Sequence, residues 1–173
     1  NIIGYREYMD NLLFIGDIAS EEANYPTTGS FGVPDIDYWN FNAFKNNDQL
    51  EFFFKYCYIG INRANSVIDN LENSDFDLQI KNQILGQAFF LRAYHYFNLA
   101  RTFGLVPMQR HTVATVAQTQ AAMAKDFDEL YDFIIDDLKQ AASLMVVNKT
   151  PSLVDKVAAQ SLLSKVYLNI ASG

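Results

Sequence analysis

A short run of aromatic and amide side chains is the part of this chain best suited to binding a ligand. It lies within residues 35–44 and contains Tyr38, Trp39, Asn40 and Asn42. Aromatic faces can stack on the C–H groups of a sugar ring, and amide groups can pair with its hydroxyls. These four residues are therefore the predicted ligand-binding residues, with a sugar as the predicted ligand.

The run falls in an irregular segment, residues 24–50. The first half of this segment holds residues that prevent a helix: Pro26, Gly29, Gly32 and Pro34. A long loop with its own aromatic residues is often a binding loop. The alternative, which the sequence leaves open, is that Trp39 and Phe41 only pack the loop onto neighbouring helices.

No set of side chains in the sequence supports catalysis. Only His95 and His111 supply imidazoles, and no zinc-protease motif, nucleophile elbow or phosphate-binding glycine loop is present. Asp136 and Asp137 would point about 100° apart on a helix, so they cannot flank one bond. Cys57 and His95 both look like core residues, which argues against a dyad. We expect no enzyme and no cofactor.

An acidic turn near the start of the chain could suggest a metal site. Asp17, Glu21 and Glu22 lie close together there. However, the longer alternating oxygen pattern of a calcium loop, with its central glycine, is missing. We expect a solvated turn in which an Asp or Ser side chain caps a neighbouring segment, and we expect no metal.

Composition narrows the class of protein. The net charge is −7, half of the residues are hydrophobic and 14% are aromatic. An acidic chain without a basic stripe does not suit nucleic acid, and such a hydrophobic chain is not disordered. No apolar run reaches the roughly 20 residues of a membrane span. The chain starts at Asn1 without a signal segment or lipid-accepting cysteine, so we expect a mature or trimmed piece of a larger protein.

The spacing of apolar residues predicts an all-α fold. Helices are expected over residues 3–15, 48–71, 77–102, 125–145 and 153–170. The last is expected to start with a capping box formed by Ser152 and Asp155. Short connections predict two antiparallel hairpins, and residues 105–123 are expected to wrap the surface.

The helix at 77–102 is apolar almost all round, so it must be covered on several sides. Gly86, Ala93 and Ala100 recur every seven residues and would let another backbone come close. His95 on this helix is expected at a helix–helix contact. Asn65 is expected to hydrogen-bond a neighbouring backbone, because an unpaired buried amide is costly.

Five motifs in order resemble the SusD-like (RagB/SusD) family. They are residues 16–23, 61–68 (INRANSVI), 86–107 (with GQAFFLRAY and FGLVP), 131–141 (YDFIIDDLKQA) and 157–168 (VAAQSLLSKVYL). Gln87 stands where the family more often has Glu. The P-R-x-T motif that the family usually has near residue 110 is not found in this sequence.

The resemblance implies degenerate tetratricopeptide-like antiparallel helix pairs, with a long irregular loop between the first and second helices. Residues 1–173 would be a single helical domain, the N-terminal portion of a larger protein. The implied function is capture of an oligosaccharide or polysaccharide by a surface lipoprotein of the cell outer membrane, and hand-over to a SusC-like TonB-dependent transporter. The lipid anchor would be absent from this chain. The alternatives are a tetratricopeptide-like scaffold that binds a peptide or partner helix, and a SusD-like capture protein for peptides or another nutrient.

Overall fold

The structure of the protein is a computed structural model. It describes residues 14–18, 20, 47–71, 74–115, 121–148 and 153–172. The chain divides into two compact units, Asn1–Tyr58 and Ile59–Gly173.

Among its described residues, the first unit contains a π-helical turn, Phe14–Ile18, and the start of helix α3 at Asp48. The Asn47 side-chain oxygen caps α3, because it accepts the backbone N–H groups of Gln49 (3.0 Å) and Leu50 (3.2 Å). Cys57 is fully buried, as its apolar neighbours predicted. Most of the helix expected at residues 3–15 lies outside the described residues.

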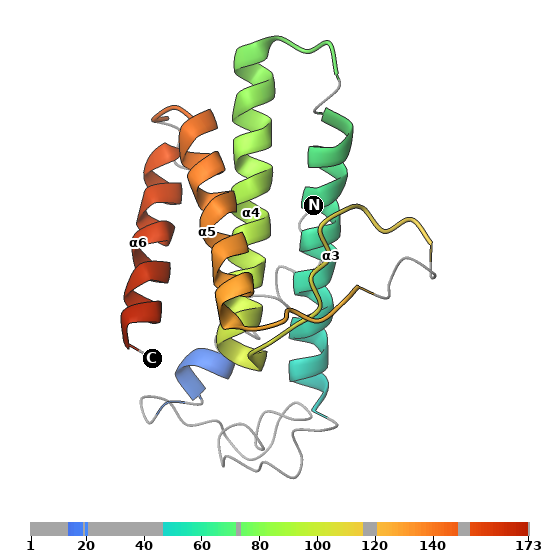
Figure 1. Ribbon diagram of the computed structural model, residues 1–173, viewed down its shortest axis with the longest axis vertical. Helices are drawn as coiled ribbons and strands as arrows, with labels where there is room; N and C mark the ends of the chain where they lie inside the picture. The colour runs from blue at the N-terminus through green and yellow to red at the C-terminus, as the bar shows by residue number, and fades with distance from the viewer. Residues whose placement is uncertain are drawn as a thin grey trace. The chain divides into compact units, whose positions relative to one another are not determined.

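Four helices carry the described fold: α3 (Asp48–Leu71), α4 (Leu78–Phe103), α5 (Phe127–Leu144) and α6 (Lys156–Ser172). The part of α3 from Ile59 onward belongs to the second unit with the other three. In that unit α3, α4, α5 and α6 run alternately up and down, and α4 lies between α3 and α5 (Figure 1). The predicted antiparallel helix pairs are confirmed.

Side-chain caps explain where α4 and α5 begin. The Asp77 carboxylate accepts the N–H groups of Gln79 and Ile80 at the start of α4. At α5, Asp126 accepts the N–H of Glu129 (2.9 Å), and the Glu129 carboxylate reaches back to the N–H of Lys125 (2.8 Å). These reciprocal bonds satisfy amides that the helix itself leaves without partners.

Helix α6 starts three residues later than the sequence predicted. Its cap is Asp155, which accepts the N–H groups of Ala158 (3.0 Å) and Asn148 (2.9 Å). The predicted start at Leu153 is therefore wrong, because Asp155 stands outside the helix and not within its first turn. The expected cap, Ser152, lies outside the described residues.

Two glycines make room for neighbouring side chains at contacts between helices. A Cβ at Gly86 would overlap the Met145 side chain and lie 3.3 Å from the Ala141 carbonyl oxygen of α5. A Cβ at Gly60 of α3 would overlap the imidazole of His95 on α4. Gly86 thus has the close-packing role that the small-residue spacing predicted, and His95 lies at a helix–helix contact.

Apolar side chains from α4, α5 and α6 meet in one cluster of the second unit. Its buried members are Leu85, Phe89, Ala141, Met145 and Ala159, and Ile68 and Leu71 of α3 pack against them. Helix α4 contributes on several sides, as expected for a central helix. None of the described helices is long and apolar enough to cross a membrane.

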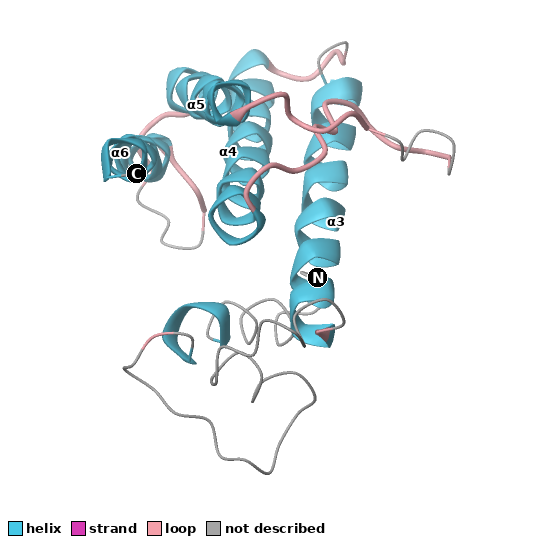
Figure 2. Ribbon diagram, turned by 60° about the horizontal axis from the view of Figure 1, so that its bottom comes forward, coloured by secondary structure: helices cyan, strands magenta, loops and turns pink. Residues whose placement is uncertain are grey.

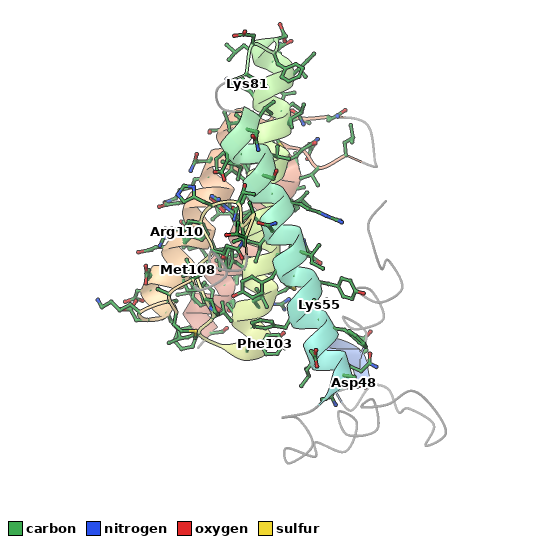
Figure 3. All side chains as sticks on the ribbon, turned by 90° about the vertical axis from the view of Figure 1, so that its right-hand side faces the viewer. Asp48, Lys55, Lys81, Phe103, Met108 and Arg110 are labelled. Atoms are coloured by element: carbon green, nitrogen blue, oxygen red, sulfur yellow. The ribbon has the colours of Figure 1, made fainter. Side chains whose placement is uncertain are left out.

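After α4 the chain reverses. Gly104, at a φ of 74°, ends the helix, and its N–H still donates to the Ala100 carbonyl (3.0 Å). The chain then runs back along the helices, with Met108 and Arg110 lying progressively closer to the Lys81 end of α4 than Phe103 does (Figure 3). The views in Figures 1 and 2 place this segment beside α3.

This segment, residues 105–115, which we call the reversing segment, is more than the surface connection that the sequence suggested. An isolated antiparallel bridge joins Pro107 to Met123, and the neighbouring backbone pairs Met108 with Ala122 (2.8 Å) and Ala124 with Val106 (3.0 Å). Without these hydrogen bonds, the buried backbone N–H and C=O groups would have no partner in an apolar environment. Val106, Met108 and Ala124 are buried, so the expectation of a purely surface segment is corrected.

Replacing Gly60 by alanine should destabilise the protein. Alanine in a helix interior is favoured over glycine by about 1 kcal/mol. Overlap with the buried His95 ring should cost more, about 1–3 kcal/mol. Urea unfolding should show a net loss for Gly60→Ala and little change for the control Gly16→Ala, which has open space around it. A Gly60→Ala protein more stable than wild type would contradict this packing.

Candidate functional site

The predicted ligand-binding residues, Tyr38, Trp39, Asn40 and Asn42, lie outside the described residues. What the structure does describe is a polar cluster at which three helices and the reversing segment meet. It is centred on Arg92 of α4 and Asp137 of α5. We call it the Arg92 cluster, and it also includes Asn65, Tyr96, Phe133 and residues 109–113.

Arg92 and Asp137 form a two-pronged ion pair. The Arg92 Nε donates to Asp137 Oδ2 and its Nη2 to Oδ1, both at 2.7 Å. The two side chains are only 7% and 2% exposed. Burial raises the pKa of Asp137, and the hydrogen bonds and charge of Arg92 oppose that rise. The paired geometry compensates two charges that would each be costly to bury alone.

Asn65 connects this pair to α3 and to the reversing segment. Its Oδ1 accepts from Arg92 Nη1 (2.8 Å), and its Nδ2 donates to the carbonyls of Gln109 and His111 (3.0 Å each). Arg92 Nη1 also donates to the Arg110 carbonyl (3.2 Å). The predicted structural role of Asn65, bonding to a neighbouring backbone, is confirmed.

Phe133 of α5 gives the cluster an aromatic wall. The guanidinium carbons of Arg92 and Arg110 lie 4.8 and 4.7 Å from its ring centre, and Tyr96 meets it edge-on at 5.4 Å. The Tyr96 hydroxyl accepts the Gln109 N–H (2.7 Å) and donates to the Gln109 carbonyl (3.1 Å). Burial raises the pKa of Tyr96 well above its ordinary value, so the hydroxyl keeps its proton.

One side of α3 fixes the reversing segment through three polar residues, Asn62, Asn65 and Asp69. Their spacing of three and four places them on the same helix face. Asn62 Oδ1 accepts the Val113 N–H (2.7 Å). The carboxylate of Asp69 accepts both the N–H and the hydroxyl of Thr112 (2.7 Å each).

The charge state of Asp69 follows from these contacts. Partial burial raises its pKa, but the Thr112 hydrogen bonds and the nearby His111 ring outweigh burial, so the pKa lies below the ordinary value. His111 Nδ1 lies 3.2 Å from Asp69 Oδ1. The carboxylate is therefore ionised at neutral pH and holds the segment as an acceptor.

The Arg92 cluster has a structural role and is not suited to catalysis. Its central carboxylate and guanidinium are buried and bonded to each other, which leaves neither open to a ligand. In the part of the chain that the structure describes, no three His, Cys, Asp or Glu side chains come together as a possible metal site. Asp17 of the acidic turn accepts the Ser20 hydroxyl at its carbonyl (2.7 Å), a local turn contact.

Sequence reasoning did not find the Arg92–Asp137 pair. The signal was present, because an arginine on a helix that is apolar almost all round must find a buried partner. Asp137 was considered only as a catalytic carboxylate beside Asp136. The sequence does not say which acidic residue reaches Arg92, because the two are 45 residues apart.

Comparison with known proteins identifies the family. Residues 20–168 match the SusD-like family that is described as starch-binding and associating with the outer membrane. SusD-like protein P2 of Formosa agariphila is 30% identical over 130 residues, which are 75% of this chain and 26% of that protein. The chain belongs to the SusD-like family.

Solved structures share the fold. A SusD superfamily protein from Bacteroides vulgatus matches 98% of this chain with a TM-score of 0.80 and 22% identity. A structure determined with a xylogluco-oligosaccharide matches 94% of it with a TM-score of 0.73 and 25% identity. The chain spans 26% of the curated relative and 36% and 32% of these two solved chains.

Replacing Arg92 alone should lower the free energy of unfolding more than replacing Arg92 and Asp137 together. Arg92→Met should leave the Asp137 carboxylate buried without its partner, at a cost of about 3–5 kcal/mol. In the double variant Arg92→Met with Asp137→Leu, much of that loss should be recovered. Urea unfolding at pH 7 measures all three proteins, and equal losses in the single and double variants would contradict the buried pairing.

Stability should fall on mild acidification because of His95. Burial lowers the pKa of His95 to about 4 from an ordinary value near 6.5. Between these values the unfolded chain binds a proton that the folded chain does not, so unfolding becomes easier as pH falls from about 6.5 toward 4. The full loss in the free energy of unfolding is about 3 kcal/mol.

The pH dependence is tested with His95→Gln, which cannot titrate. Urea midpoints at pH 7.5 and 5.0 should differ less in this variant than in wild type. An equal slope in His95→Gln and wild type would show that other groups cause the effect.

Proposed function

We propose that this chain is part of a surface protein that captures a glycan and hands it to a SusC-like TonB-dependent transporter, without covalent chemistry. The observation that carries the proposal is the family match over residues 20–168, whose description is starch-binding. The similar structure determined with a xylogluco-oligosaccharide supports the same class of ligand. The matched range includes the four predicted ligand-binding residues.

The proposed binding residues are Tyr38, Trp39, Asn40 and Asn42. Two adjacent aromatic rings offer faces for sugar rings, and two amides supply both donors and acceptors for hydroxyls. None of these four side chains carries a charge, and the net charge of the whole chain is −7. An uncharged glycan therefore suits this part of the protein better than an anionic polysaccharide, which would be repelled.

Hand-over requires that the glycan be released unchanged. Hydrogen bonds and stacking contacts are reversible, so a binding loop can pass its ligand to a transporter. We place the protein at the outer membrane as a surface lipoprotein, in agreement with the family description of association with that membrane. We also propose that residues 1–173 are one helical domain, the N-terminal portion of a larger protein; the chain spans 26% of one relative and 36% of another.

The single tryptophan of this chain makes the proposal testable. Titration with a panel of neutral oligosaccharides should shift the fluorescence of Trp39 saturably for one sugar class. Tyr38→Ala should abolish the shift, because the adjacent stacking face is lost. Phe76→Ala is the control, since it removes an exposed aromatic residue from a different turn and should leave the response intact.

Calorimetric titration of the longer protein completes the test, because relatives extend well beyond this chain. Binding there that is lost in Tyr38→Ala supports a glycan site at this loop. No binding to any sugar, together with capture of a peptide that is insensitive to changes at residues 38–42, would overturn the proposal in favour of a peptide-binding scaffold.

A further inference from the structure

The far end of the reversing segment, residues 111–113, is held by α3. We call these three residues the tip. Within the described structure, every polar partner of the tip lies on α3, at Asn62, Asn65 or Asp69. Asn62 both accepts the Val113 N–H (2.7 Å) and donates to the Val113 carbonyl (3.3 Å). The attachment of the tip therefore depends on one helix and on polar contacts.

The two ends of the reversing segment differ in burial. Val106 and Met108 near its start are 2% and 9% exposed, whereas the His111 side chain is 85% exposed. Ala114 and Thr115, which follow the tip, are exposed as well. Apolar burial thus holds the start of the segment, while hydrogen bonds and charge hold the tip. A segment held in this way can open at its tip while its buried start stays in place.

One of these polar contacts can change its strength with protonation. Oδ1 of Asp69 lies 3.2 Å from Nδ1 of the His111 ring, while Oδ2 accepts both donors of Thr112. Histidine is the side chain that gains a charge between about pH 8 and pH 5. Partial burial raises the pKa of Asp69, but the Thr112 hydrogen bonds and His111 outweigh it, so the carboxylate stays ionised over that interval. A protonated His111 ring therefore meets a negative charge.

The other charged side chains around the tip are paired with each other or lie on other faces. They are Arg63 of α3, Arg92 of α4, Arg110 of the reversing segment, and Glu129, Asp136 and Asp137 of α5. The arginines of α4 and of the reversing segment bind carboxylates of α5, at 2.7 and 3.0 Å. Arg63 lies about 120° around α3 from Asp69, and Asp136 is on the exposed side of α5. In the described structure, Asp69 is thus the charged group that contacts the His111 ring.

We propose that Asp69 and His111 form a proton-operated latch, which holds the tip of the reversing segment against α3 more tightly when His111 is protonated. When the tip opens, the polar side chains of Asn62 and Asp69 lose their partners on the segment and face solvent. The latch responds to acid in the opposite direction from the whole fold, which mild acidification destabilises through the buried His95. The inference is independent of which ligand the protein binds.

Hydrogen exchange of the Val113 backbone N–H, followed by NMR at pH 7.5 and 5.5, tests the latch. This N–H donates to Asn62, which does not titrate, so its protection factor reports closure of the tip. After correction for the pH dependence of exchange in an unfolded chain, protection should rise about two- to five-fold on acidification, the range of an exposed ion pair. The N–H of Leu138, a fully buried residue of α5, reports global unfolding, and its protection should fall over the same interval.

Three variants, with their helices verified by circular dichroism, separate the latch from a purely structural contact. His111→Gln can still donate a hydrogen bond but cannot gain a charge, and Asp69→Asn keeps the shape of the side chain without its charge. The rise in Val113 protection should vanish in both. Glu129→Gln is the matched control, because it removes a nearby carboxylate that pairs with Arg110, and the rise should remain. Val113 protection that is constant or falls in wild type would overturn the proposal, as would a rise that persists in His111→Gln.

Discussion

The buried pair of Arg92 and Asp137 is the constraint on which the rest of the described structure depends. Neither charge is tolerable in the interior without the other, and the guanidinium has further N–H groups to satisfy once the carboxylate is bound. Those groups are met by Asn65 of α3 and by the Arg110 carbonyl. Three helices and one irregular segment are thus joined through a single side chain.

Polar side chains around this ion pair explain why an irregular segment can lie within the fold. A segment without regular hydrogen bonding can be buried only if its backbone finds other partners. Asn62, Asn65, Asp69 and Tyr96 supply these partners to residues 109–113. The three α3 residues share one helix face, so the helix offers the segment a row of side-chain donors and acceptors in place of a neighbouring strand.

The helices could be predicted from sequence because local signals determine them. The bounds of α3 agree with the predicted residues 48–71, and the ends of α4 follow from the Asp77 cap and the break at Gly104. The start of α6 was missed because Ser152 and Asp155 are both acceptable caps by residue type, and the structure shows Asp155 accepting the Ala158 N–H at the start of the helix.

The polar interior was less predictable, because its bonds join residues distant in sequence. Arg92 needed a partner, but several acidic residues on the next helix could have supplied it. The burial of Val106 and Met108 depends on backbone hydrogen bonds to Ala124 and Ala122, which lie further along the chain. The proposed sugar-binding residues rest on side-chain chemistry alone. Their types suggest a ligand, while the direction in which they point is a property of the assembled loop.

The position of Arg92 also bears on the order in which the molecule assembles. Its partners Asn65 and Asp137 lie 27 and 45 residues away, so α3 and α4 brought together without α5 would trap a desolvated cation. Such half-assembled states are penalised, which couples α3, α4 and α5 into one cooperative folding unit. α6 joins this unit through other contacts, since Ala159 lies in the buried cluster with Leu85 and Ala141, and Asn169 accepts the Tyr131 hydroxyl.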